Sequence, residues 1–361
     1  MTNVLMLSSD ATLLTENYSN TLQRHTQYAK KLGGLFAIVL TKRAAHHSKN
    51  NGLTIIPVQK KFFWPYRLLQ VAKKICQKEK IDVITTQDPF LLGFIGVLLK
   101  RKFNIPLNVQ IHSEFFVNNY WNARAKNKFL IMLGRYVLSR ADTIRTVNPK
   151  VYAFLKQFRA KRYWIPIATD TSLFSIKKNY ELTSQVVFVG RLSPEKNTKL
   201  LIKAMVIVQK KIPNAKLVIV GDGAERNALQ SLVKKHKVHA NFLGFQQHKE
   251  LQKILHQSAC LVLPSFYEGW GLAAIEALSC GVPVIMTNTG CAGEILEDGT
   301  TGYIVSPYNH TMLAKRILRL MTKPSLQKKF GLAGRTRVEE LLNKDKLRKQ
   351  WIECLKQTAS E

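Results

Sequence analysis

The sequence predicts an α/β protein of two domains, each built on a parallel sheet with helices on both faces. The first observation is length, because 361 residues are enough for two domains of ordinary size. The second is that strand-like and helix-like segments alternate over residues 3–147, and a second alternating series starts near Val186. The third is a hydrophobic fraction of 46%, which is typical of globular proteins.

In the first series, short apolar runs predict strands and amphipathic stretches predict helices between them. The expected strands are residues 3–8, 36–41, 81–88, 106–112 and 141–147. The expected helices are residues 19–32 and 127–140.

In the second series, the strands are expected at 185–191, 215–223, 240–245, 259–264 and 282–287. Helices are expected at 196–212, 224–236, 249–258 and 272–279. The last of these helices is Ala- and Leu-rich and is followed by Gly281 and Pro283, which are typical stop signals.

These patterns predict four segments along the chain. They are an N-terminal domain (1–165), a linker with few regular signals (166–184), a C-terminal domain (185–335) and a final helix that returns to the first domain (336–361). Ligands of such sheets bind at the carboxyl ends of the strands, so we expect the site in a cleft between the domains.

Positive charge is concentrated in the first half. Lys and Arg number 55 against 23 Asp and Glu, a formal net charge of +32, and residues 1–180 hold 29 basic and only 8 acidic side chains. Nucleic acid, an anionic membrane surface or a phosphorylated substrate would each suit this charge. A Lys-rich genome would also produce it without any polyanionic partner.

We expect neither a secretion signal nor a membrane-spanning segment in this sequence. The apolar run at 89–99 is too short to cross a bilayer, and no basic region precedes the first apolar residues. The five cysteines are scattered without metal-ligand spacing, which favours a reducing cytoplasm, and Cys260 and Cys280 are expected in the core.

Two carboxylates, Glu268 and Glu276, stand in the otherwise apolar, glycine-spaced residues 265–285. They bracket a turn, with Gly269 and Gly271, that lies between a strand and a helix. The helix N-terminus there suits a phosphate, and the carboxylates suit the hydroxyls of the same ligand. The alternative is that Glu268 caps the helix and Glu276 points to solvent.

Further polar residues follow other strands. Arg191 and Lys196 combine a forked donor with a mobile charge, a pairing suited to a diphosphate. Gly221 and Gly223 would let a ligand approach the backbone, while Asp222 either contributes or caps the next helix. His112 ends an apolar strand, where a structural histidine is as frequent as a functional one.

Five motifs in this order resemble those of the retaining, nucleotide-sugar-dependent glycosyltransferases of family 4. They are FVGRLSPEKN (188–197), LVIVGDG (217–223), FLGF (242–245), PSFYEGWGLAAIEALSCGVPVI (264–285) and GEILEDGTTGYIV (293–305). The first half is similar more loosely, through residues 87–96, 105–112 and 141–147. The resemblance implies the GT-B architecture, in which two Rossmann-like domains face each other across a cleft.

The resemblance also implies roles. Glu268 would contact sugar hydroxyls and Glu276 the ribose, Arg191 and Lys196 the diphosphate, and His112 would lie near the transferred sugar. The remaining donor contacts would be backbone around Gly221, Gly223, Leu243 and Gly244, and residues Gly269, Trp270, Gly271 and Leu272; Glu294 matches a position of uncertain role.

No cofactor and no metal are expected, because the donor is a substrate and the sequence has no Asp-x-Asp pair. Cations and a helix end would then stabilise the diphosphate in place of a metal. One departure is that residues 8–22 lack the Gly-Gly loop that many members have after the first strand. Acceptor handling and the phosphate contact of the first domain depend on that loop.

The resulting expectation is a retaining hexosyltransferase with a UDP- or GDP-linked donor and a lipid-linked or polysaccharide acceptor of the cell envelope. Alternatives are a related nucleotide-sugar enzyme such as an epimerase, and an inactive sugar-nucleotide-binding module. A nucleic-acid-binding protein is disfavoured because no such motif is present. The oligomeric state, the donor sugar and the acceptor linkage stay open.

Residues 58–80 predict contact with an anionic membrane on its cytoplasmic face. Lys60, Lys61 and Arg67 surround the aromatic residues Phe62, Phe63, Trp64 and Tyr66, and a helix is expected from about Pro65 onward. An apolar stripe follows at Leu68, Leu69, Val71, Ala72, Ile75 and Cys76. We expect that stripe to pack on the sheet, and the aromatic cluster to be the better candidate for membrane contact.

Overall fold

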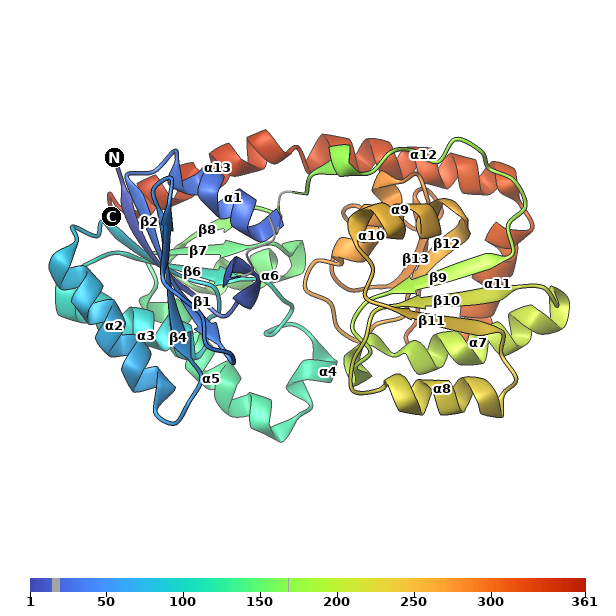
Figure 1. Ribbon diagram of the computed structural model, residues 1–361, viewed down its shortest axis with the longest axis horizontal. Coiled ribbons are helices and arrows are strands. Elements are labelled where there is room, and N and C mark those ends of the chain that lie inside the picture. The colour runs from blue at the N-terminus through green and yellow to red at the C-terminus, as the bar shows by residue number, and fades with distance from the viewer. Residues whose placement is uncertain (15–19, 168) are drawn as a thin grey trace. The chain divides into compact units, whose positions relative to one another are not determined.

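The computed structural model describes residues 1–14, 20–167 and 169–361. The chain divides into two compact units (Figure 1). The first unit contains Met1–Pro166 and Asp345–Glu361, and the second contains Ile167–Lys344. Each unit is a parallel sheet covered by helices, so the predicted α/β class is confirmed for both.

The sheet of the first unit has eight strands in the order β3-β4-β2-β1-β5-β6-β7-β8. All neighbours pair in parallel except β3 with β4. The strands are β1 (Asn3–Ser8), β2 (Gly34–Thr41), β3 (Ser48–Asn50), β4 (Leu53–Gln59), β5 (Val83–Thr86), β6 (Leu107–Ile111), β7 (Thr143–Thr146) and β8 (Lys161–Trp164).

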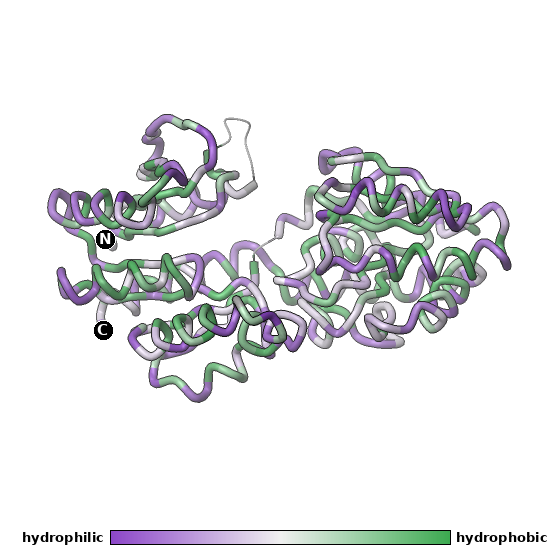
Figure 2. Tube along the Cα trace, turned by 90° about the horizontal axis from the view of Figure 1, so that it is seen from below, coloured by the Kyte–Doolittle hydropathy of each residue, from purple (hydrophilic) through white to green (hydrophobic). Residues whose placement is uncertain are grey.

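Helices cover both faces of this sheet. On one side lie α2 (Trp64–Lys78), α3 (Leu91–Phe103) and α5 (Ala125–Arg140), and on the other α1 (Asn20–Ala29) and α13 (Lys344–Thr358) (Figure 1). Shorter segments complete the unit, namely η1 (Ala11–Leu14), α4 (Asn119–Asn122), α6 (Pro149–Phe154) and η2 (Leu155–Gln157). Helices alternate between hydrophobic and hydrophilic residues along their turns, as amphipathic helices on a sheet must (Figure 2).

The sheet of the second unit has six parallel strands in the order β11-β10-β9-β12-β13-β14. They are β9 (Gln185–Val189), β10 (Lys216–Val220), β11 (Ala240–Gly244), β12 (Ser258–Leu263), β13 (Val284–Thr287) and β14 (Gly302–Val305). The helices are η3 (Thr171–Leu173), η4 (Pro194–Lys196), α7 (Thr198–Lys211), α8 (Arg226–Lys235), α9 (His248–His256), α10 (Leu272–Ser279), α11 (His310–Met321) and α12 (Pro324–Leu341).

Both sheets change direction once along the chain. In the second unit the chain moves outward from β9 to β11 and then returns to place β12 on the other side of β9. In the first unit the corresponding point lies between β1 and β5. Loops that leave two such strands diverge, which opens a crevice at the carboxyl edge, and this is where open α/β sheets bind ligands.

The end of the chain belongs to the first unit. Thr358 lies 2.7 Å from Thr143 of β7, and Trp351 stacks under the guanidinium of Arg145 at 4.6 Å. The predicted final segment began at residue 336, but residues 336–341 complete α12 in the second unit, so the division lies at 344/345. Residues 336–343 contain no Gly or Pro, so the sequence pattern did not show that α12 ends at Leu341.

All predicted strands and helices correspond to observed elements, and several elements were missed. Residues 53–59 form β4 although they contain Pro57, which lies beyond the residues that pair with β3. The apolar run at 89–99 is largely the buried helix α3. No helix in the described ranges is both long enough and apolar enough to span a membrane. Cys260 and Cys280 are fully buried in the core, as expected.

Candidate active site

The candidate site of the second unit lies where its sheet changes direction. The loop after β9 (residues 190–197) and the loop after β12 (residues 264–271) leave neighbouring strands at the carboxyl edge. They are joined by a backbone hydrogen bond from Phe266 N to Glu195 O at 2.8 Å. The Asn197 side chain donates to Pro264 O at 3.1 Å and to Pro307 O at 2.9 Å. These bonds fix the spacing of the two loops.

Glu268 is the central group of this site. It is only 6% exposed, and one carboxylate oxygen lies 2.7 Å from Lys196 Nζ. The other accepts a hydrogen bond from Ser265 Oγ at 2.7 Å. Glu268 therefore does not act as a helix cap, because no side chain caps α10. Removing one partner of such a buried pair typically costs about 3–5 kcal/mol, so Lys196 has a structural role besides any ligand contact.

Arg191 is available for an anion. Its side chain is exposed, and within the described part of the chain no hydrogen bond or ion pair engages its guanidinium. Because Lys196 pairs with Glu268, Arg191 is the more exposed cation of the loop after β9, and its charge helps to lower the pKa of Glu195 in the same loop. Exposure and pairing therefore distinguish Arg191 from Lys196, and the contact of both with a diphosphate stays a prediction.

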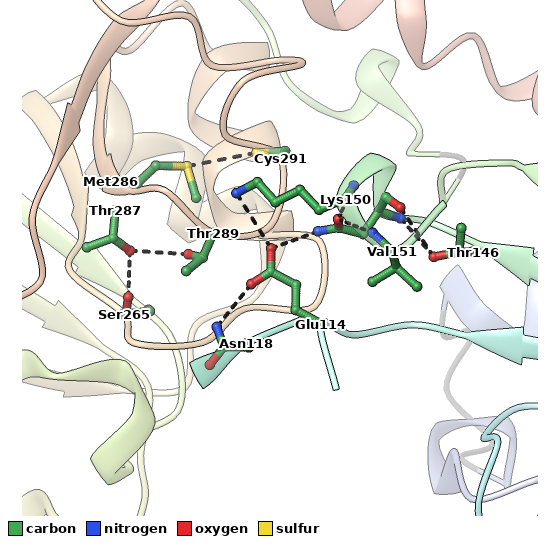
Figure 3. A network of polar contacts seen from close by, with 11 residues as sticks. Glu114, Asn118, Thr146, Lys150, Val151, Ser265, Met286, Thr287, Thr289 and Cys291 are labelled. Carbon is green, nitrogen blue, oxygen red and sulfur yellow. Dashed lines mark hydrogen bonds and ion pairs between the residues drawn. The ribbon is translucent and has the colours of Figure 1, made fainter. Parts of the chain in front are cut away.

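Threonines that follow or end β13 hold the turn that contains Glu268. Thr287 Oγ1 at the end of β13 donates to Ser265 O at 2.5 Å and lies 3.2 Å from Thr289 (Figure 3). Gly271 has a φ of 80° and precedes α10, whose first N–H groups have no side-chain cap. Trp270 is buried and Leu272 is 45% exposed, so the predicted backbone contact at 269–272 stays a prediction.

Glu276 lies one turn into α10 and is partly buried, with a side chain 16% exposed. Burial raises the pKa of Glu276 to about 7. One oxygen lies 3.8 Å from Nδ1 of His248, the first residue of α9. Glu276 therefore does not point into open solvent, and its contact with a ribose stays a prediction.

Gly221 and Gly223 are explained by packing inside the protein. A Cβ on Gly221 would lie 2.0 Å from Gly190 O, and one on Gly223 would lie 2.3 Å from Leu192 O. Both glycines therefore let the loop after β10 lie against the loop after β9. Asp222 caps no helix; it accepts from Gly223 N at 2.7 Å and pairs with Arg226 at 3.1 Å.

The loop after β11 is more open. Leu243 is 42% exposed, and Gly244 has a φ of 68° with no close neighbour at its Cβ position. Gly244 O accepts from Gly221 N at 2.7 Å. Glu294 engages the protein through its backbone, since its carbonyl accepts from Arg337 Nε at 3.0 Å. Among the described residues no group of three or more His, Cys, Asp or Glu side chains could hold a metal ion.

In the first unit, His112 follows β6 and is half-buried. Its Nε2 lies 3.1 Å from Oε1 of Gln110, and the same oxygen accepts from Arg145 Nη1 at 3.0 Å. Burial, with smaller contributions from Arg145, Arg24 and His25, lowers the pKa of His112 to about 3. His112 is therefore a neutral imidazole at physiological pH.

Glu114, two residues further on, anchors the loop that carries His112. It is 2% exposed and accepts from Asn148 Nδ2 at 2.9 Å and from Asn118 Nδ2 at 3.2 Å, with Lys150 at 3.9 Å (Figure 3). Asn148 also caps α6. The loops after β6 and β7 are thus tied together by one buried carboxylate.

Sequence reasoning missed Gln110, Arg145, Glu114 and Ser265. A signal for the first was present, because Asn108, Gln110 and His112 alternate with apolar Val109 and Ile111. Polar residues on one face of a central strand need partners, so that alternation indicates a buried polar network. The glycine-free stretch at 8–22 lies partly at residues 15–19, outside the described residues. Its first residue, Ser8 at the end of β1, donates from Oγ to Gln87 Oε1 at 2.5 Å, across the change of direction of the sheet.

A cavity of about 850 Å³ lies elsewhere in the first unit. It is formed between η1, α1 and residues 44–55, and none of the predicted site residues lines it. Its inner wall includes Leu13, Leu22, Leu53 and Ile55, and its rim includes Lys30, His46 and His47. It therefore combines apolar walls with a basic edge.

Two family models match the chain. Glycosyl transferases group 1 matches residues 171–337, and Glycosyltransferase Family 4 matches residues 19–173. An uncharacterized glycosyltransferase of Methanocaldococcus jannaschii is 27% identical over 270 residues, 74% of this chain and 73% of that protein. A glycogen synthase of Mycobacterium tuberculosis is 26% identical over 266 residues, 71% of this chain and 64% of that protein.

Solved structures share the fold over nearly the whole chain. Sucrose-phosphate synthase of Thermosynechococcus elongatus has a TM-score of 0.84 at 23% identity and covers 99% of both chains. HepE of Anabaena, solved with UDP and glucose, has a TM-score of 0.77 at 15% identity and covers 99% of this chain and 100% of its own.

The pKa of Glu276 predicts how stability depends on pH. Because its pKa is about 7 in the folded protein and near 4.3 when unfolded, the folded state loses stability as pH rises between these values. Glu276→Gln should therefore melt several degrees higher than wild type at pH 8, and the difference should vanish near pH 5. Glu250→Gln on α9, where the side chain is 51% exposed, is the control. Equal differences at both pH values would contradict the buried carboxyl.

Proposed function

Because this chain belongs to the glycosyltransferases, with a family 4 part at 19–173 and a group 1 part at 171–337, we propose that it transfers a hexose from a UDP- or GDP-linked donor with retention of configuration. The acceptor is a lipid-linked or polysaccharide precursor of the cell envelope. The observation that supports the donor site best is the buried Glu268–Lys196 pair beside exposed Arg191, where the second sheet changes direction.

Each predicted donor residue has a role suited to its chemistry. Glu268 offers buried carboxylate oxygens to sugar hydroxyls, and Glu276 offers its carboxyl to the ribose. Arg191 and the N-terminus of α10 meet the diphosphate. Lys196 serves two purposes, since it neutralises Glu268 and can turn toward the phosphate when a sugar hydroxyl donates to that carboxylate. The base then lies against Leu243 and Gly244.

The chemistry follows from the leaving group. When the glycosidic bond breaks, negative charge grows on the diphosphate, and preorganised positive groups stabilise it without a strong general acid. The acceptor attacks on the face that the phosphate leaves, and that phosphate accepts the acceptor proton. Sugar-nucleotide contact is also supported by HepE, a structural neighbour solved with UDP and glucose.

An anionic, partly apolar acceptor is supported by the first unit. Between Glu16 and Glu79 the chain has twelve Lys or Arg residues and no Asp or Glu. Within this range Phe62, Phe63 and Tyr66 are 87%, 72% and 62% exposed. We propose that this cluster contacts the inner face of the cytoplasmic membrane, which makes the protein peripheral. The apolar stripe behind it packs on the sheet as expected, with Leu68 and Ala72 fully buried.

The donor site is tested by nucleotide-sugar screening and by variants. Wild type should show slow hydrolysis of one donor in a panel of UDP and GDP sugars. Arg191→Ala should lower kcat by about 10- to 150-fold, since a charge-assisted hydrogen bond contributes about 1.5–3 kcal/mol. Glu276→Ala should weaken nucleotide binding. Lys203→Ala, an exposed change on α7, is the control.

Lys196 needs a different design. Lys196→Ala removes the counterion of Glu268 and should slow turnover while also lowering the melting temperature. Lys196→Arg keeps the charge and should preserve folding, so its kinetics separate the effect of side-chain geometry from the loss of the counterion. Wild-type kinetics in Arg191→Ala, Glu276→Ala and Lys196→Arg together would refute the donor site.

Metal independence is a second expectation of the proposal. Activity should persist in excess EDTA, because Arg191, Lys196 and the end of α10 supply the positive charge that a metal supplies elsewhere. The measurement is the transfer rate with EDTA, then with Mg²⁺ or Mn²⁺ added. Complete loss with EDTA and recovery with either ion would contradict the assigned phosphate site.

Membrane contact is tested by co-sedimentation with vesicles. Wild type should bind vesicles containing phosphatidylglycerol more than neutral ones, and less so at high salt, because basic residues contribute about 1 kcal/mol each near an anionic surface. Replacing Lys60, Lys61, Phe62 and Phe63 should abolish binding; Trp64 is left in place because it packs against the core. Lys234→Ala with Lys235→Ala on α8 is the charge control. Equal binding to both vesicle types would exclude this surface.

A further inference from the structure

A chain of polar side chains crosses the sheet of the first unit and starts at His112. Beyond Gln110, it continues by hydrogen bonds of 2.7–2.9 Å from Gln110 Nε2 to Thr85 Oγ1, Thr85 Oγ1 to Asn108 Oδ1, and Asn108 Nδ2 to Thr143 Oγ1. Apart from His112, these side chains are at most 2% exposed. In a setting without water, each donor needs an acceptor, so the directions of the bonds are constrained.

The end at α13 fixes one direction. Thr358 Oγ1 donates its only hydrogen to Cys354 O at 2.7 Å. In its contact with Thr143, Thr358 is therefore the acceptor and Thr143 the donor. Thr143 then accepts from the amide of Asn108, which leaves Asn108 Oδ1 to accept from Thr85. Because the Thr85 hydroxyl donates its only hydrogen to Asn108 Oδ1, it can only accept from Gln110, and Gln110 must therefore present its NH₂ group to Thr85.

Arg145 fixes the same direction from the other side. A guanidinium can only donate, and Arg145 donates to Ile165 O at 3.0 Å, Pro166 O at 3.2 Å and Gln110 Oε1 at 3.0 Å. It is 6% exposed and stacks on Trp351, and although burial lowers its pKa to about 10 it stays cationic at neutral pH. If the Gln110 amide were flipped, its NH₂ group would face the Arg145 guanidinium, and both groups are donors. Two independent ends thus assign the same orientation to Gln110.

The consequence falls on His112. Its Nε2 faces an oxygen that can only accept, so Nε2 must bear the proton and Nδ1 the lone pair. We propose that Gln110 and Arg145 are positioning residues that hold His112 in the Nε2–H tautomer. Resting on the proposed function, the lone pair of Nδ1 then accepts a hydrogen bond from a substrate hydroxyl. The site would therefore reject a sugar that lacks a hydroxyl donor at that position.

The electrostatic surroundings keep the ring neutral, so that the tautomer is defined. Burial lowers the pKa of His112 most, and the positive charges of Arg145 and Arg24 and the nearby His25 act in the same direction. Burial likewise lowers the pKa of His25 to about 4. Neither histidine is protonated at physiological pH, so a positively charged His112 does not arise.

The direct test is the ¹⁵N spectrum of the histidine rings in the full-length protein, with His112 assigned by its absence in His112→Gln. The expected result is a pyrrole-type Nε2 and a pyridine-type Nδ1, constant from pH 6 to 8. The opposite tautomer, or a ring that protonates in this range, would overturn the proposal. The spectrum needs no substrate, so it is independent of whether the donor site is correct.

Variants separate positioning from folding. Gln110→Met should release the ring into a mixture of tautomers and lower kcat by about 10- to 100-fold, the loss seen when a partner that orients a metal-ligating histidine is removed. The KM for the donor should not change. Gln110→Glu keeps an acceptor facing Nε2 and Arg145, so the Nε2–H tautomer should persist at pH 8. Because this variant loses the donor to Thr85 Oγ1, its melting temperature should be lower than that of wild type. Gln230→Met, an exposed change in the second unit, is the control.

The outcomes are distinguishable. Gln110→Met with an unchanged spectrum and unchanged kcat would overturn the positioning role, and if that variant does not fold, Gln110→Glu and wild type still decide. An Nε2–H spectrum together with full transfer activity in His112→Ala would support the tautomer and overturn its contact with substrate. If only the Arg191 and Glu276 variants lost activity, the contact of His112 with substrate would likewise be overturned.

Discussion

A buried carboxylate with one counterion is the constraint around which the second unit is arranged. Glu268 is withdrawn from water, so it must keep Lys196 and Ser265 within hydrogen-bond distance. Lys196 follows β9 and Glu268 follows β12, and these strands are neighbours only because the sheet reverses direction between them. The Phe266–Glu195 backbone bond and the two bonds of Asn197 hold that spacing. The glycines at 221 and 223 then let the next loop pack against the same segment.

The first unit has a similar change of sheet direction, but its carboxyl edge carries different groups. At the centre of its carboxyl edge, after β1, β6 and β7, side chains are neutral or paired. Ser8 bonds Gln87, Glu114 bonds Asn148, and His112 is kept uncharged by burial near Arg145. Exposed positive charge lies further along the same edge, in residues 42–49 after β2 and residues 60–67 after β4. The proposed diphosphate site of the second unit therefore contains a strong ion pair. The strand ends around His112 in the first unit instead present neutral, oriented hydrogen-bond donors and acceptors.

The alternation of the chain was sufficient to predict the central strands of both sheets and the helix at 272–279, because period and turn residues are local properties; β3, β4, β8 and β14 were not predicted. The residues that complete the sites depend on distant partners. Arg145 reads as one polar residue in a short strand, and only the return of α13 with Trp351 explains its burial. Ser265 and Lys196 are 69 positions apart, and their shared contact with Glu268 follows from strand order rather than from sequence. The packing role of Gly221 and Gly223 was also hidden in the sequence, because the carbonyls next to their Cβ positions come from the loop after β9. Their contact with a ligand stays a prediction.

The proposed function depends on the donor binding at the sheet edge between β9 and β12. Hydrogen–deuterium exchange of the full-length protein with and without a nucleoside diphosphate measures this directly, because bound ligand slows the opening of the backbone it contacts. The account predicts protection concentrated at residues 190–197 and 264–276, with little change in the basic segment at 42–67. Protection confined to that basic segment, with none in the two loops of the second unit, would contradict it.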